Sequence, residues 1–173
     1  MRRYIYFVFL LCCAVNLLLT SCVRQKYVVM DMVHHNPGEA MTESKFLDPS
    51  FLKKNEYGAK VFFLFEAAQF GIDWKSFDPS LFPDTTEAGR WVAEKAEIIH
   101  KKYDAAKKED LQVYCMLDML VLPSLLVEKH RTELTNEQGK LDISKPYTQL
   151  CIRELMKEMF ETFPQLDGLV IRT

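Results

Sequence analysis

The chain has 173 residues, of which 49% are hydrophobic and 27% charged, and its formal net charge is −2. This composition is that of a folded globular protein and excludes a disordered tail, a collagen and a disulfide-dense miniprotein. The slightly negative charge disfavours nucleic acid as the main partner, because a polyanion needs a basic binding face. The length favours a single folded domain.

The N-terminus has the pattern of an export signal. Arg2 and Arg3 precede an apolar run over residues 4–20, which only Asn16 interrupts. A positive start followed by an apolar run is typical of a secretory signal peptide. An uncleaved membrane anchor is the alternative, because a run of about 17 residues lies near the lower limit for spanning a bilayer.

The end of this run favours a lipoprotein over a retained anchor. The sequence Leu19-Thr20-Ser21-Cys22 resembles the lipobox of bacterial lipoproteins. That resemblance implies cleavage before Cys22 and acylation of this cysteine, and acyl chains hold a protein on a membrane. We therefore expect a signal peptide over 1–21, a lipidated linker over 22–26 and a domain over 27–173, anchored in the cell envelope at the outer membrane or the periplasmic face.

Two cysteines, Cys115 and Cys151, remain in the expected domain. One lies in an apolar run and the other in a helical pattern, so buried free thiols are expected rather than a disulfide. The sequence contains no CxxC motif and no Cys/His spacing typical of metal ligands. No metal and no other cofactor is therefore predicted.

Apolar runs rich in Val, Phe, Tyr and Ile predict four strands. Because these runs do not alternate with polar residues, they are typical of parallel strands that are covered on both faces. The runs are Tyr27 to Val33, Ala59 to Phe65, Leu111 to Leu117, and Leu169 to Ile171.

Helical patterns separate the runs. The clearest covers Glu87 to Lys108, with apolar residues at steps of three and four, and Asp84, Thr85 or Thr86 can cap its start. A second covers Pro146 to Phe163 and ends before Pro164. Shorter helices are expected over Pro49 to Asn55 and over Ser124 to Glu133, and the side chains of His100 and His130 are expected to be solvated.

The resulting β-α alternation predicts an α/β fold with parallel crossovers. A doubly wound nucleotide-binding fold would need a glycine-rich phosphate loop after the first strand. Residues 31–39 contain neither GxGxxG nor a Walker lysine. We therefore favour a partial (β/α)₈ barrel with about four strands. A complete barrel needs about 250 residues, so a longer parent protein or a truncated gene product is expected, with a complete four-stranded α/β sandwich as the alternative.

Polar residues follow the predicted strands, where the carboxyl ends of parallel strands form one rim. Glu66 and Asp118 are the candidate catalytic residues, because paired carboxylates can act as acid and base, or as acid and nucleophile, in glycosidic cleavage. The plainer interpretation is that Asp31 and Asp118 cap the loops or helices that follow them. Arg172 would then be a structural partner of Asp118 or Glu66. The candidates for substrate binding are Asp31, His34, His35, Asn36, Trp74 and Arg172, and Gln69 lies at the same rim.

Four segments resemble the N-terminal half of a (β/α)₈ glycoside hydrolase-like protein, of a type common among lipoproteins of Bacteroidetes. They are Tyr27 to His35, Ala59 to Trp74, Leu111 to Pro123 and Asp167 to Thr173. The resemblance implies a carbohydrate ligand. In many such barrels the general acid follows the fourth strand, where this sequence ends, so we expect sugar binding but no turnover by this chain alone. The alternative is a non-enzymatic, lipid-anchored α/β module with a binding or structural role.

Overall fold

The computed structural model describes residues 28–31, 45–63, 66–118 and 120–172. The expected signal peptide, the expected lipidation site Cys22, and the candidate residues His34, His35 and Asn36 lie outside these ranges. Within the described part of the chain, no helix combines the length and the apolar character that crossing a membrane requires.

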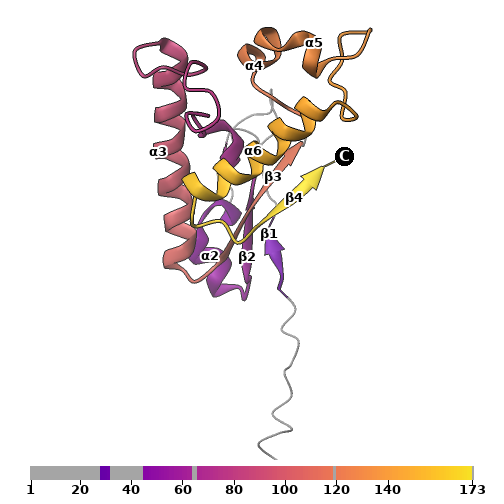
Figure 1. Cartoon of the computed structure of the whole chain (residues 1–173). Coiled ribbons are helices and arrows are strands. Elements are labelled where there is room, and N and C mark those ends of the chain that lie inside the picture. The colour runs from indigo at the N-terminus through magenta and orange to yellow at the C-terminus, as the bar shows by residue number, and fades with distance from the viewer. Residues whose placement is uncertain (1–27, 32–44, 64–65, 119, 173) are drawn as a thin grey trace, which may run out of the picture.

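The described strands point in the same direction (Figure 1) and form one parallel sheet with the order β1-β2-β3-β4. The expected α/β fold with a parallel sheet is therefore confirmed. β2, β3 and β4 are longer strands, whereas β1, at one edge of the sheet, consists of two residues. Their bounds are β1 (Met30–Asp31), β2 (Ala59–Phe62), β3 (Gln112–Asp118) and β4 (Gly168–Arg172).

The two long helices match their sequence patterns closely. α3 covers Glu87–Lys108, and the Thr86 side chain caps it by accepting a hydrogen bond from the Gly89 N–H at 3.0 Å. α6 covers Pro146–Thr162 and begins with proline, whose missing N–H is tolerated in the first turn. The remaining helices are η1 (Lys45–Leu47), α2 (Pro49–Lys54), η3 (Ala68–Phe70), α4 (Ser124–Lys129) and α5 (Arg131–Leu134).

The helix expected over Ser124 to Glu133 is divided in two at His130. This residue has φ −121° and ψ 34°, outside the helical region, and ends α4 while it precedes α5. Its ring packs against Tyr147 with the ring centroids 4.7 Å apart, and the ring of His100 packs likewise on Phe163 at 4.6 Å. Both histidines are half-buried, so the expectation that they are simply solvated was wrong.

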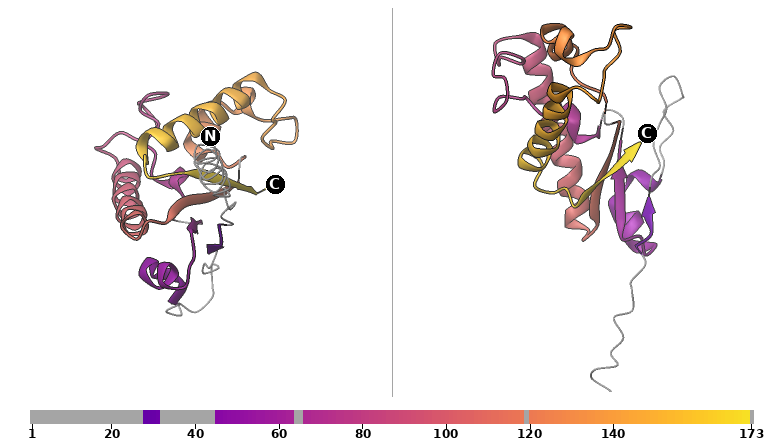
Figure 2. Two further views of the ribbon diagram at one scale, coloured as in Figure 1. Left: turned by 90° about the horizontal axis from the view of Figure 1, so that it is seen from below. Right: turned by 45° about the vertical axis from the view of Figure 1, so that its right-hand side comes forward.

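The three main helices cover one face of the sheet. In the left view of Figure 2, α2, α3 and α6 follow one another round the same side of the strands. Because helices cover only one face, the residues of β3 after the first are alternately buried and half-buried along the strand. Val113, Cys115 and Leu117 belong to the core beneath the helices, whereas Asp118 and its neighbours on the other face do not. The apolar run predicted that β3 would be buried continuously on both faces, whereas its burial alternates from residue to residue.

The core between sheet and helices is built from large side chains. Tyr103 of α3, Leu155 and Met159 of α6 and Phe163 are each at most 1% exposed. Cys115 and Cys151 are buried free thiols, as expected. Burial raises the pKa of each thiol to about 11, so both are protonated and unreactive near neutral pH.

Candidate functional site

The last residues of β3 and β4 form an ion pair at the carboxyl end of the sheet. Asp118 and Arg172 are directly paired in the strand register, so their side chains point to the same face. Arg172 Nε and Nη2 each donate to one Asp118 carboxylate oxygen at 2.6 Å. This bidentate arrangement is the strong form of the arginine–carboxylate interaction.

The ion pair fixes the charge state of both groups. Hydrogen bonds from Arg172 lower the pKa of Asp118, and the same bonds raise the pKa of Arg172. The side chain of Asp118 is 38% exposed and that of Arg172 is 65% exposed, so a ligand can reach both. At neutral pH the pair presents an ionised carboxylate and a guanidinium side by side.

The pair lines a small pocket, here called the rim pocket, with a volume of about 120 Å³. It lies between the loop that follows β2 and the segment that follows β3. Its other lining residues are mainly apolar or aromatic, with one amide among them: Phe63, Gln69, Phe70, Met116, Leu117 and Val121. Gln69 was placed at this rim from the sequence, whereas Phe70 was missed because a single aromatic beside a strand end carries no signal of its own.

Glu66 does not reach the rim pocket. Its carboxylate forms an ion pair with Lys102 of α3, and its backbone carbonyl accepts a hydrogen bond from Tyr103 Oη at 3.0 Å. It lines a different cavity, together with Lys60 and other residues on the helix-covered side. The expectation that Glu66 and Asp118 face one common cavity was therefore wrong. The physical reason is that β2 ends at Phe62, so that Glu66 lies beyond the strand and against α3.

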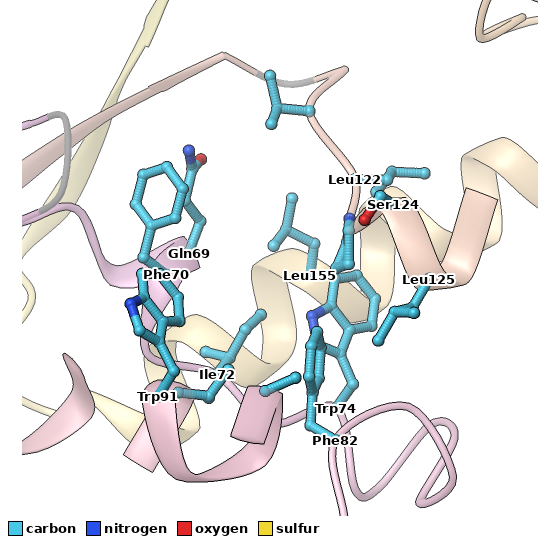
Figure 3. Close-up of a pocket in the computed structure, with 14 residues that line it drawn as sticks. Gln69, Phe70, Ile72, Trp74, Phe82, Trp91, Leu122, Ser124, Leu125 and Leu155 are labelled. Carbon is cyan, nitrogen blue, oxygen red and sulfur yellow. The ribbon is translucent and has the colours of Figure 1, made fainter. Parts of the chain in front are cut away.

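Trp74 also lies away from the Asp118–Arg172 pair. It is 1% exposed and belongs to the hydrophobic core, so its rings are not available as an open stacking platform. It lines a larger space beside the rim pocket, here called the apolar cavity, with a volume of about 550 Å³ (Figure 3). Asp31 is the last residue of β1, opposite Lys60 in the register, and its side chain lies outside the described part.

The described residues offer no metal site. No group of three or more His, Cys, Asp or Glu side chains among them is arranged to hold an ion.

In comparisons with known proteins, no family model, no curated protein and no solved structure matches the chain. The geometry alone defines the candidate site, which consists of the rim pocket with its ion pair and the adjoining apolar cavity.

Proposed function

We propose that this chain is a lipid-anchored protein of the (β/α)₈-barrel type that binds carbohydrate at the carboxyl ends of its strands. The strand order supports the barrel type. In a doubly wound sheet the order reverses at a switch point and helices cover both faces. The described strands run β1-β2-β3-β4 without reversal, and α2, α3 and α6 lie on one side, as the helices of a barrel do (Figure 2).

The observation that carries the binding proposal is the Asp118–Arg172 pair in the rim pocket. Each Asp118 oxygen accepts one hydrogen bond from Arg172 and keeps lone pairs for sugar hydroxyls. The guanidinium keeps further N–H groups that can donate to hydroxyl oxygens. Gln69 adds an amide, and Phe70 adds an aromatic side chain for the apolar face of a sugar ring.

The geometry favours binding over cleavage. Glycosidic cleavage needs two carboxyl groups on either side of the bond, one of which carries a proton. Asp118 is held in its ionised form by Arg172, so it cannot donate that proton near neutral pH. Glu66, the other catalytic candidate, lines a separate cavity and pairs with Lys102. The non-enzymatic binding module, the alternative from the sequence, is therefore the better supported version of the proposal.

Removal of the Asp118 charge tests the binding proposal. We expect Asp118→Asn to weaken sugar binding about tenfold or more, because a hydrogen bond to a charged group contributes roughly 1.5–3 kcal/mol. The measurement is binding of the full chain to an array of bacterial and plant glycans, followed by titration with the best ligand. Because Arg172 lowers the pKa of Asp118, binding should be constant from pH 5 to 8 and decline only at more acidic pH, where the carboxylate takes up a proton.

Asp110→Asn is the matched control. Asp110 forms a similar exposed ion pair, with Lys53 Nζ at 2.9 Å, but it precedes β3 at the opposite end of the strand. The same loss of charge there should leave sugar affinity unchanged. If both variants bind equally well, or if no glycan binds the unchanged chain, the carbohydrate proposal is wrong.

The proposed lipid anchor has its own test. The lipobox-like sequence before Cys22 implies that this cysteine is the acylated first residue of the mature protein. Mass spectrometry of the membrane fraction should detect an acylated N-terminal peptide that begins at Cys22. Cys22→Ser should abolish processing and leave the uncleaved chain. Recovery of an intact Met1 peptide from the unchanged protein would instead identify the apolar run as a retained anchor.

A further inference from the structure

The apolar cavity is the largest feature of the candidate site that carbohydrate binding leaves unexplained. It is enclosed by the loop after β2, the first turns of α3, the segment leading into α4, and α6 (Figure 3). Gln69, Phe70 and Val121 line both the cavity and the rim pocket, so the two are neighbours. A volume of about 550 Å³ lies in the range of cavities that hold small organic ligands.

The walls of the cavity are suited to a flat, apolar ligand. Phe70 and Trp91 lie on one side, and Trp74 and Phe82 lie on the other (Figure 3). Among the described residues that line it, none carries a charge. Apart from the indole N–H groups of the two tryptophans, the polar side chains are those of Gln69 and Ser124. A sugar would leave most of its hydroxyl groups without partners here, and an anion would find no cation.

Two buried polar atoms at this cavity have no hydrogen-bond partner among the described residues. They are Trp74 Nε1, a donor, and Gln69 Oε1, an acceptor. Trp74 is 1% exposed, so its N–H has almost no contact with bulk water. Leaving a buried donor unpaired is costly, and most buried polar groups in folded proteins are paired. A ligand oxygen that accepts from Trp74 Nε1 would remove this cost.

The backbone at Trp74 supports a role beyond packing. Its φ is +58°, in the left-handed region that a bulky residue rarely adopts. The turn is held by its carbonyl, which accepts hydrogen bonds from the N–H groups of Phe77 at 3.0 Å and Asp78 at 2.7 Å. Unfavourable backbone conformations of this kind persist where the surrounding structure imposes them, and they are concentrated at ligand sites.

The mouth of the cavity is also apolar. Trp91, Val121 and Leu125 line it and are 42%, 47% and 41% exposed, respectively. We propose that the apolar cavity binds a neutral, planar aromatic compound that carries a hydroxyl group. The aromatic rings of the ligand would lie between the two aromatic sides. Its hydroxyl oxygen would accept from Trp74 Nε1.

The test compares 2-naphthol with naphthalene, which has the same rings but no hydroxyl. Trp74 and Trp91 are the two tryptophans of the chain, and both line the cavity, so tryptophan emission reports binding directly. The full chain is titrated in phospholipid nanodiscs, and signals from empty nanodiscs are subtracted. We expect saturable binding of 2-naphthol with a Kd about tenfold or more below that of naphthalene, as for a buried hydrogen bond that only one ligand can make.

Two matched variants separate the hydrogen bond from the packing. Trp74→Phe keeps an aromatic ring and removes the N–H, so the preference for 2-naphthol should disappear, with Trp91 as the reporter. Trp91→Phe is the control, and it should keep the preference, with Trp74 as the reporter. Ala88→Phe provides a test that leaves Trp74 unchanged, because a larger side chain at this lining position should fill the cavity and abolish binding of both compounds.

The proposal is overturned by any of three results. These are the absence of saturable 2-naphthol binding to the unchanged chain, equal affinity for naphthalene, and a preference that survives Trp74→Phe. Decanoic acid, an aliphatic probe with a charged head, should not displace 2-naphthol, and efficient displacement would indicate a site for acyl chains instead. None of these outcomes depends on sugar binding at Asp118, so this proposal and the carbohydrate proposal can fail separately.

Discussion

Phe163→Ala is expected to lower the free energy of unfolding by about 3–5 kcal/mol, the usual range for removal of a buried phenylalanine ring. Phe163 follows α6 directly and is 0% exposed. Its ring packs against His100 and Tyr103 of α3, with centroid distances of 4.6 and 5.6 Å. The variant would therefore leave a cavity between the two long helices, where neighbouring side chains cannot close it without moving the helices.

Phe160→Ala is the matched control for this prediction. Phe160 lies in the last turn of α6, but it is 42% exposed. Its loss should change the unfolding free energy by no more than about 0.5 kcal/mol, as for most surface substitutions. Urea denaturation of the full chain, followed by circular dichroism, measures both variants. Similar effects of the two substitutions would contradict the packing of the Phe163 ring against α3.

The elements with strong periodicity could be predicted from the sequence. The stripe that includes Val92, Ile99 and Tyr103 predicted α3 with both of its ends, and these residues are buried. Thr86 was one of three candidate caps, and the structure selects it. The parallel sheet followed from the apolar runs, because such runs separated by helices are joined by crossovers.

The candidate site could be predicted only where it depends on strand register. Asp118 and Arg172 end neighbouring strands, so the parallel arrangement brings them together. Glu66 could not be placed in the same way. Its position depends on where β2 ends, and an apolar run does not show which of its residues still pair with the next strand. The sequence predicted that Trp74 lies at the rim. Its backbone has a positive φ, which directs the side chain into the core, and this conformation cannot be predicted from the sequence.

Gly89→Ala should destabilise the chain, although alanine normally favours a helix. Gly89 lies in the first turn of α3, and its exchange for alanine would ordinarily contribute about 1 kcal/mol through helix propensity. Here the new Cβ would lie 2.7 Å from the carbonyl carbon of Pro83, and closer still to its oxygen. This carbonyl cannot easily withdraw, because it accepts hydrogen bonds from the Thr86 N–H at 2.9 Å and the Thr86 hydroxyl at 2.7 Å.

The steric conflict therefore falls on the cap of α3 itself. Thr86 Oγ1 also accepts from the Gly89 N–H, so any shift of Pro83 or Gly89 weakens the hydrogen bonds that begin the helix. Overpacking against a rigid neighbour costs about 1–3 kcal/mol, and the contact with the Pro83 carbonyl is close enough to place the cost near the upper end of this range. After subtraction of the propensity gain of about 1 kcal/mol, we expect a net loss of about 2 kcal/mol in the free energy of unfolding.

Ala93→Gly, at an exposed position in the same helix, reverses the exchange and should cost about 1 kcal/mol through propensity alone. Alanine should thus be the better residue at 93 and glycine the better residue at 89. Urea denaturation of Gly89→Ala and Ala93→Gly measures the change in the free energy of unfolding at each position. A stabilised Gly89→Ala variant would mean that the Pro83 carbonyl does not contact the first turn of α3.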